Sequence, residues 1–223
     1  MIKRLYPYRF EIFLFSQMII IFNSIVFPGD IFAGWIGPLS FQINFVSALI
    51  LLSKKKKLMG FFGFMVIITT FLLGTTFFPK FNQSTIWIMR TFVYLIFYFF
   101  VTTEIIQQVW KIKNVNSKAI LGMIAGYISL GLVGFFFLSF VYAIDHESFS
   151  TLSSPSDNLS LDYVQDKLLY FSFITLLTIG YGDMVPLTPI AQKTTIFIGL
   201  SGQMYLTIIT AIVVGKFLNK KKD

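Results

Sequence analysis

The segment TIGYGD, residues 178–183, places two glycines one residue apart between apolar stretches of the chain. Glycine enters left-handed backbone conformations without steric cost, so Gly180 and Gly182 allow a backbone that alternates in handedness and points successive carbonyls the same way. A line of such carbonyls can replace the hydration shell of a cation without any charged side chain. These residues therefore indicate cation coordination by the backbone.

The composition limits the chemistry that the rest of the chain can supply. Of the 223 residues, 56% are hydrophobic and 13% are charged, and the mean hydropathy is +0.76. A soluble domain has about a quarter of its residues charged, so the sequence indicates an integral membrane protein. Cysteine is absent and histidine occurs once, which disfavours disulfides, thiolate metal sites and histidine-based catalysis. We therefore expect no enzyme activity and no cofactor.

Six apolar runs are each long enough to cross a hydrocarbon core of about 30 Å as a helix. The second run contains glycine, proline and polar residues, which membrane helices tolerate. The sequence therefore predicts an all-α membrane protein with six transmembrane helices, over residues 10–27, 31–52, 58–78, 85–110, 119–144 and 190–218.

The positions of the 18 lysine and arginine residues predict the orientation. With the N-terminus inside, most of them fall on the inner segments, and the positive-inside rule then favours a multi-pass protein of the cell membrane with both termini cytoplasmic. The net charge of +8 comes from clusters at the ends of apolar runs, not from a basic solvated face. Membrane lipid, and not nucleic acid, is therefore the expected contact.

A shorter apolar segment, residues 168–177, precedes the TIGYGD segment and is too short to cross the membrane. We expect a re-entrant helix that starts at the outer surface with Asp166 as its N-cap. Its C-terminal end would bring partial negative charge to membrane depth. The chain must then return outward as irregular backbone, which is tolerated there only when it is buried in protein or lines a water-filled cavity.

The stretch TIGYG, residues 178–182, is similar to the selectivity-filter signature of potassium channels, and residues 119–218 resemble the pore module of that family. The resemblance implies stacked potassium sites made by successive carbonyls and one hydroxyl, with potassium as the permeant ion rather than a cofactor. Gly182 would turn the chain outward. The coordinating carbonyls would be those of Thr178, Ile179, Gly180 and Tyr181, and the hydroxyl that of Thr178.

The resemblance also implies side chains that support such a filter. Tyr181 would turn away from the pore and pack against the re-entrant helix. Asp183 would hydrogen-bond behind the filter to an aromatic donor, for which Tyr170 is the candidate, with a phenol in place of the more usual indole.

The last span would carry the gate and line the cavity. Gly202 lies where the family's hinge glycine would sit, and it shares one helical face with Leu206 and Thr210. For Gly202, a hinge and a site of close helix packing both remain open.

The chain contains one filter segment and no internal repeat, so a pore requires a homotetramer around a central axis. We expect a four-helix N-terminal membrane domain over residues 1–117 and a pore domain over residues 118–218. A short basic cytoplasmic tail would follow over residues 219–223.

Six spans with the pore in the last two is the layout of voltage-gated channels, but the fourth span carries Arg90 alone instead of a series of basic residues. One charge in each of four chains supplies at most about 9 kcal/mol per 100 mV, so we expect weak or no voltage gating. Arg90 is expected to pack or to reach the outer interface, and Glu104 to reach the inner one.

Two alternatives to a potassium-selective channel remain, namely a poorly selective cation channel and a non-conducting regulatory subunit. The first four spans could serve assembly, lipid sensing or contact with a regulatory partner or ligand, and the sequence does not choose among these roles.

Overall fold

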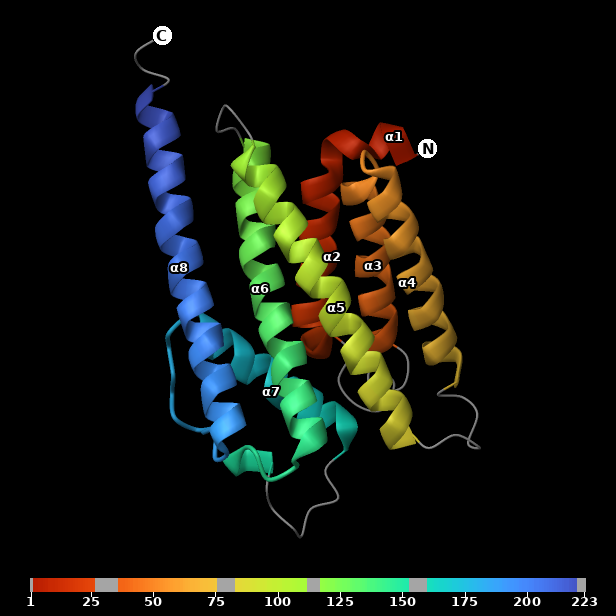
Figure 1. The fold of residues 1–223 in the computed structure, drawn as a ribbon, viewed down its shortest axis with the longest axis vertical. Coiled ribbons are helices and arrows are strands. Elements are labelled where there is room, and N and C mark those ends of the chain that lie inside the picture. Colours follow the sequence, from red (N-terminus) through yellow and green to blue (C-terminus); the bar gives the residue numbers. More distant parts are fainter. Residues whose placement is uncertain (1, 27–35, 76–82, 112–116, 153–159, 220–223) are drawn as a thin grey trace.

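The computed structural model describes residues 2–26, 36–75, 83–111, 117–152 and 160–219, and these are almost entirely helical (Figure 1). In this part of the chain the one β-feature is an isolated bridge between Phe149 and Pro186. The N-terminal helices are α1 (Ile2–Leu5), η1 (Tyr6–Tyr8), α2 (Arg9–Val26), α3 (Gly37–Leu52), α4 (Lys56–Thr75) and α5 (Gln83–Trp110). They are followed by α6 (Ser117–Ile144), η3 (Ser150–Leu152), α7 (Leu161–Leu176) and α8 (Pro189–Asn219).

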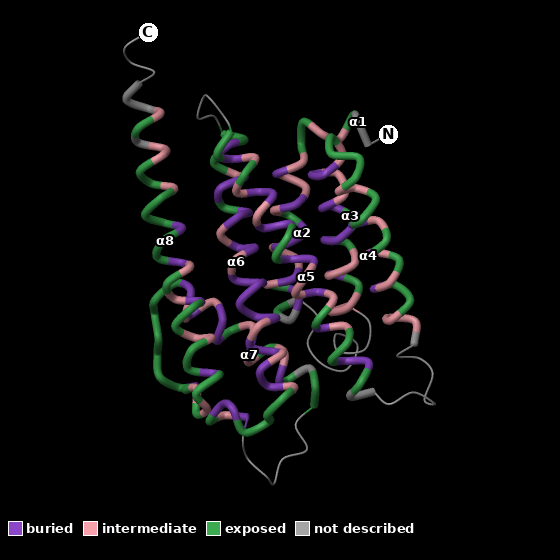
Figure 2. The backbone as a smooth tube through the Cα atoms, viewed as in Figure 1, coloured by how far each residue is buried: buried purple, intermediate pink, exposed green. Residues whose placement is uncertain are grey.

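Helix α6 is the centre of the fold. It packs against α2 and α5 of the N-terminal helices on one side and against α7 and α8 on the other (Figure 1). Burial follows this arrangement, because 72% of the most apolar stretch of α6 is buried, against 17% for α8 (Figure 2). One chain therefore leaves most of α8 uncovered.

Four of the described helices are long and apolar enough to cross a membrane, namely those over Lys56–Gly74, Thr85–Trp110, Ser117–Ile144 and Pro189–Val213. They match four of the six predicted runs closely. The other two runs correspond to α2 and to the 16-residue apolar helix α3, so the six-span count remains a prediction. Helix α1 and the C-terminal end of α8 lie at the same end of the bundle (Figure 1).

The short helix α7 begins earlier than the sequence indicated. Its N-cap is Ser160, whose hydroxyl accepts a hydrogen bond from the backbone N–H of Tyr163, and Asp166 lies inside the helix. The prediction of Asp166 as N-cap was therefore wrong. The helix starts within a polar stretch that can lie at the membrane surface, whereas the prediction placed its start at the edge of the apolar run.

Several polar side chains inside the N-terminal helices are hydrogen-bonded to one another. The side-chain amide of Asn44 accepts from the Tyr98 hydroxyl at 2.8 Å and donates to Ser16 at 2.8 Å. Gln17 on α2 donates to Ser129 on α6 at 2.7 Å, which joins the two halves of the chain in the interior. Such bonds between helices replace those that water would otherwise make.

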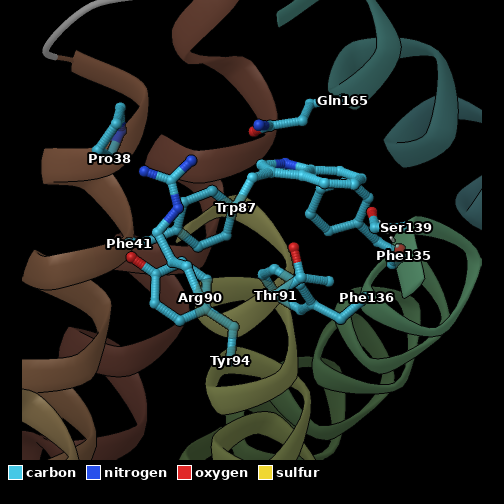
Figure 3. Close-up of a pocket in the computed structure, with 10 residues that line it drawn as sticks. All are labelled: Pro38, Phe41, Trp87, Arg90, Thr91, Tyr94, Phe135, Phe136, Ser139 and Gln165. Atoms are coloured by element: carbon cyan, nitrogen blue, oxygen red, sulfur yellow. Dashed lines mark hydrogen bonds between the residues drawn. The ribbon is translucent and has the colours of Figure 1, made fainter. Parts of the chain in front are cut away.

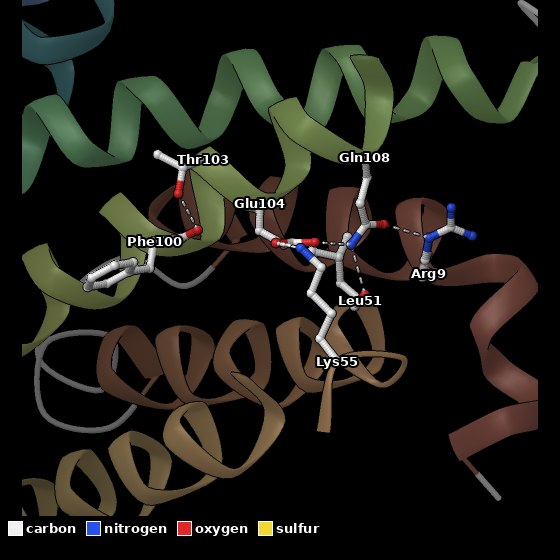
Figure 4. Close-up of polar contacts among 7 residues, drawn as sticks. All are labelled: Arg9, Leu51, Lys55, Phe100, Thr103, Glu104 and Gln108. Carbon is white, nitrogen blue, oxygen red and sulfur yellow. Dashed lines mark hydrogen bonds and ion pairs between the residues drawn. The ribbon is translucent and has the colours of Figure 1, made fainter. Parts of the chain in front are cut away.

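Helix α5 carries the two charged residues that the sequence singled out. Arg90 lies two turns into the helix, on the side that faces α3 and α7, and lines a small cavity (Figure 3). Glu104 lies near the other end, where it is buried and pairs with Lys55 at 2.6 Å (Figure 4). Gln108 donates to Glu104 and to the Leu51 carbonyl, both at 3.1 Å. Glu104 therefore joins α5 to the turn between α3 and α4, and Gln108 joins α5 to the end of α3.

Candidate functional site

The TIGYGD segment starts directly after α7, and the join is a Schellman motif, which closes a helix with two hydrogen bonds around a left-handed residue. The Ile179 N–H bonds the Ile174 carbonyl at 2.8 Å, and the Thr178 N–H bonds the Thr175 carbonyl at 3.0 Å. The left-handed residue is Thr178, with φ +58°. Glycine usually occupies this position, because a side chain there costs about 1–2 kcal/mol.

The last carbonyls of α7 all accept hydrogen bonds. The Phe173 carbonyl accepts from the Leu177 N–H at 2.9 Å, and those of Ile174 and Thr175 accept within the Schellman motif. The Leu176 carbonyl accepts from the Tyr127 hydroxyl of α6 at 3.1 Å. The end of α7 therefore offers the partial negative charge of its helix dipole rather than free carbonyls. The hydrogen bond from Tyr127 of α6 sets the position of this helix end.

Left-handed backbone recurs at every second residue of the segment. The φ angles are +58° at Thr178, +56° at Gly180 and +81° at Gly182, and these are the positive φ angles in the described residues. A Cβ added at either glycine would meet no atom within 4 Å, so conformation, and not crowding, requires glycine at these two positions. The alternation of left-handed residues also includes Thr178, which the sequence did not indicate because threonine carries a Cβ.

The whole segment lies on the surface of the single chain. The side chains of Ile179 and Tyr181 are 48% and 72% exposed. The resemblance implied that Tyr181 packs against the pore helix, but its own chain does not provide that cover. In the single chain, the segment therefore lacks the burial that irregular backbone needs inside a membrane.

Tyr170 of α7 and Asp183 after the segment interact, and this is the pair that the resemblance implied. Partial burial of the Tyr170 phenol, together with its hydrogen bond to Asp183 and the charge of that carboxylate, raises the tyrosine pKa above its ordinary value. The Asp183 carbonyl accepts from the Thr151 hydroxyl at 3.0 Å. The end of the segment is thus held by Tyr170 of α7 and by Thr151, which lies between α6 and α7.

The serine-rich loop after α6 holds the chain beyond Asp183, a role that the sequence analysis missed. The Ser150 N–H donates to the Val185 carbonyl, and the Val185 N–H donates to the Ser150 hydroxyl, both at 3.1 Å. The Leu187 N–H donates to the Ser148 carbonyl at 2.8 Å. The only signal in the sequence was the density of serine and threonine in an outer loop, which is common in loops of any kind.

On α8, Gly202 packs against the last turn of α7. A Cβ at this position would overlap the Leu176 carbonyl oxygen and lie 2.9 Å from the Leu176 Cδ1. The close approach gives Gly202 a packing role, whether or not the helix also bends there. Leu206 and Thr210, one and two turns further along, are exposed in the single chain.

No group of three or more histidine, cysteine, aspartate or glutamate side chains that could hold a metal ion occurs in the described residues. Residues 123–219 match the protein family described as "Ion channel". This range contains α7, the TIGYGD segment, all of α8 and most of α6. This family match supports an ion channel rather than an enzyme, and the helices with four candidate spans fit an all-α membrane protein.

A second comparison matches part of the chain to a named protein. A stretch of 63 residues is 38% identical to a protein of Aeropyrum pernix named "Voltage-gated potassium channel". The match covers 28% of this chain and 21% of the relative, so the chain spans only about a fifth of that protein's length. No solved structure matches the chain.

Proposed function

We propose that the chain forms a potassium-selective channel that conducts passively across the cell membrane, with both termini cytoplasmic. The observation that carries the proposal is the left-handed backbone at every second residue from Thr178 to Gly182. Alternating handedness lets successive carbonyls point to the same side, as coordination of a dehydrated cation requires. The coordinating groups are the carbonyls of Thr178, Ile179, Gly180 and Tyr181 with the Thr178 hydroxyl, and Gly182 turns the chain outward.

Four chains around one axis complete the pore. One segment cannot surround an ion, and the exposed segment and the uncovered α8 of the single chain supply the surface that neighbouring copies would bury. The Tyr170–Asp183 pair supports the filter from behind. Leu206 and Thr210, exposed on α8, face the cavity below it.

Gating by voltage is weak or absent in this proposal. Within the described part of α5, Arg90 is the one basic residue, and the acidic residue Glu104 is tied to Lys55. A single charge for each chain supplies too little energy for steep gating. The word "voltage-gated" in the name of the Aeropyrum pernix protein describes that protein, whose length this chain matches only in small part.

The test is the reversal potential of the purified protein in planar bilayers with potassium on one side and sodium on the other. We expect a value close to the potassium equilibrium potential, lost in Gly180→Ala because alanine resists the left-handed conformation. Gly63→Ala on α4, where an added Cβ meets no atom within 4 Å, is the matched control and should keep the selectivity. A reversal potential near zero in the unmodified protein would favour a poorly selective cation channel.

The absence of any current would favour the non-conducting regulatory subunit. The mass of the detergent-solubilised particle tests the assembly separately, since a homotetramer carries four copies of a 25.6 kDa chain. A particle of one or two chains would contradict the proposed pore.

A further inference from the structure

A small cavity lies where α3, α5, α6 and α7 meet, away from the TIGYGD segment (Figure 3). It offers about 20 Å³ to the centre of a water-sized sphere, which is room for one or two small atoms. Pro38 and Phe41 of α3 and Phe135 and Phe136 of α6 form apolar walls.

The polar side chains around this cavity are rich in hydrogen-bond donors. Trp87, Arg90, Thr91 and Tyr94 come from α5, and Gln165 comes from α7. Figure 3 shows the Arg90 guanidinium and the Gln165 amide directed toward the same side of the cavity. An arginine and an indole can only donate, while hydroxyls and a side-chain amide can donate as well as accept. The site therefore suits an occupant that accepts several hydrogen bonds.

Two of these donors lack a counterpart within the described residues. The Tyr94 hydroxyl is buried without a hydrogen bond, on a residue that is only 3% exposed. No ion pair within 4 Å joins Arg90 to a carboxylate of the described residues. None of the described residues that line the cavity is acidic. A guanidinium within a membrane span is costly unless its charge is balanced, and a buried hydroxyl without a partner adds to the cost.

We propose that this cavity is an anion site, in which Arg90 supplies the charge and Trp87, Tyr94 and Gln165 supply hydrogen bonds. A single-atom inorganic anion fits the space, and so does one phosphate oxygen of a lipid headgroup that enters from the membrane side. Because Arg90 lies on α5 and Gln165 on α7, the anion joins the N-terminal helices to the helix that precedes the TIGYGD segment. The proposal does not depend on potassium conduction.

The first experiment uses bromide, an anion that quenches tryptophan fluorescence. Trp35 and Trp110 are replaced by phenylalanine, so that Trp87 reports alone in the purified, delipidated full-length protein. Sodium bromide replaces sodium gluconate at constant ionic strength. We expect saturable quenching in the Arg90 protein and a half-saturation concentration at least about tenfold higher in Arg90→Gln.

Two variants separate binding from folding. Tyr94→Phe keeps the ring and removes only the buried hydroxyl, so it should fold and raise the half-saturation concentration by about threefold. Lys193→Gln on α8 removes a basic residue that does not line the cavity and should leave the bromide curve unchanged.

The lipid source is tested on the same delipidated protein. Phosphatidylglycerol and a glucosyl diacylglycerol with the same acyl chains are compared for their effect on the melting temperature. If a headgroup phosphate is the anion, phosphatidylglycerol alone raises the melting temperature, and Arg90→Gln abolishes the difference. If a free ion is the anion, bromide quenching saturates without any phospholipid. Linear quenching that is equal in the Arg90 and Arg90→Gln proteins, with no difference between the lipids, would overturn the proposal and leave a water-filled cavity.

Discussion

The Tyr127 hydroxyl on α6 donates a hydrogen bond of 3.1 Å to the carbonyl of Leu176, the last residue of α7. The same carbonyl oxygen is the atom against which Gly202 of α8 packs. Three helices therefore meet at one backbone group, two residues before Thr178. The position of α8 and the start of the TIGYGD segment are linked through this contact.

Removal of the Tyr127 hydroxyl tests the link. Tyr127→Phe keeps the ring and leaves the Leu176 carbonyl without its donor, so we expect a loss of about 1–2 kcal/mol in the free energy of unfolding. Thermal unfolding in detergent measures it. Tyr163→Phe, on an exposed part of α7, should change stability by less than about 0.5 kcal/mol. Equal effects of the two variants would contradict the role of Tyr127.

Gly202→Ala places a methyl group on the Leu176 carbonyl. We expect a destabilisation of about 1–3 kcal/mol, because the backbone of α7 must move to make room. Gly215→Ala lies on the same helix with no atom within 4 Å of the new Cβ, and should be neutral or stabilising by up to about 1 kcal/mol. If Gly202→Ala were as stable as the unmodified protein, a hinge without close packing would explain the glycine better.

Thr178 adopts a left-handed conformation that glycine would adopt without strain. Thr178→Gly should therefore raise the free energy of unfolding by about 0.5–1 kcal/mol, since the relief of strain exceeds the entropy lost on ordering glycine. The same variant lacks the hydroxyl that we propose to coordinate potassium, so its selectivity in bilayers should fall. Thr178→Ser, which keeps the hydroxyl, should retain selectivity. A loss of stability in Thr178→Gly would show that threonine is unstrained at this position.

The Tyr170 pKa predicts how stability changes in alkaline solution. Its native pKa lies above the ordinary value of 10.0, so the folded protein holds the phenol proton more tightly than the unfolded chain. This contribution is complete below pH 10 and is lost as the pH rises through the native pKa. The melting temperature should thus fall more steeply above pH 10 in the unmodified protein than in Tyr170→Phe. Identical curves would rule out the contribution.

Glu104 is buried and holds Lys55, which is about half exposed. Glu104→Gln leaves the lysine without its charge partner, but the ammonium can still reach water, so we expect a loss of about 1–2 kcal/mol in stability. Glu147→Gln, on an exposed loop, should have less than about 0.5 kcal/mol effect. The double variant Lys55→Met with Glu104→Gln should recover part of the loss, and a further decrease would argue against a direct pair.

Local patterns in the sequence predicted the helices and the unusual segment well. The apolar runs over residues 85–110 and 119–144 correspond to candidate spans at Thr85–Trp110 and Ser117–Ile144. An apolar run of this length is by itself a strong signal for a helix that crosses the membrane. Gly180 and Gly182 indicated left-handed backbone, because glycine is the residue that adopts it without cost.

Features that depend on contacts between distant residues could not be predicted. The left-handed Thr178 follows from the hydrogen bonds at the end of α7, and its residue type argues against that conformation. The pairing of Glu104 with Lys55 joins residues 49 positions apart. The start of α7 was misplaced for a different reason, since a capping serine ahead of a polar turn gives no hydropathy signal.

The exposure of residues 178–182 on the single chain has a consequence for genetics. In the four-chain pore proposed above, each copy contributes one quarter of every ion site. One defective copy therefore impairs potassium coordination in the whole assembly. Where equal amounts of unmodified and Gly180→Ala chains mix at random, only about one assembly in sixteen is free of the defect. A cell with both alleles would therefore lose most of its conductance, and the mutation would be inherited as dominant.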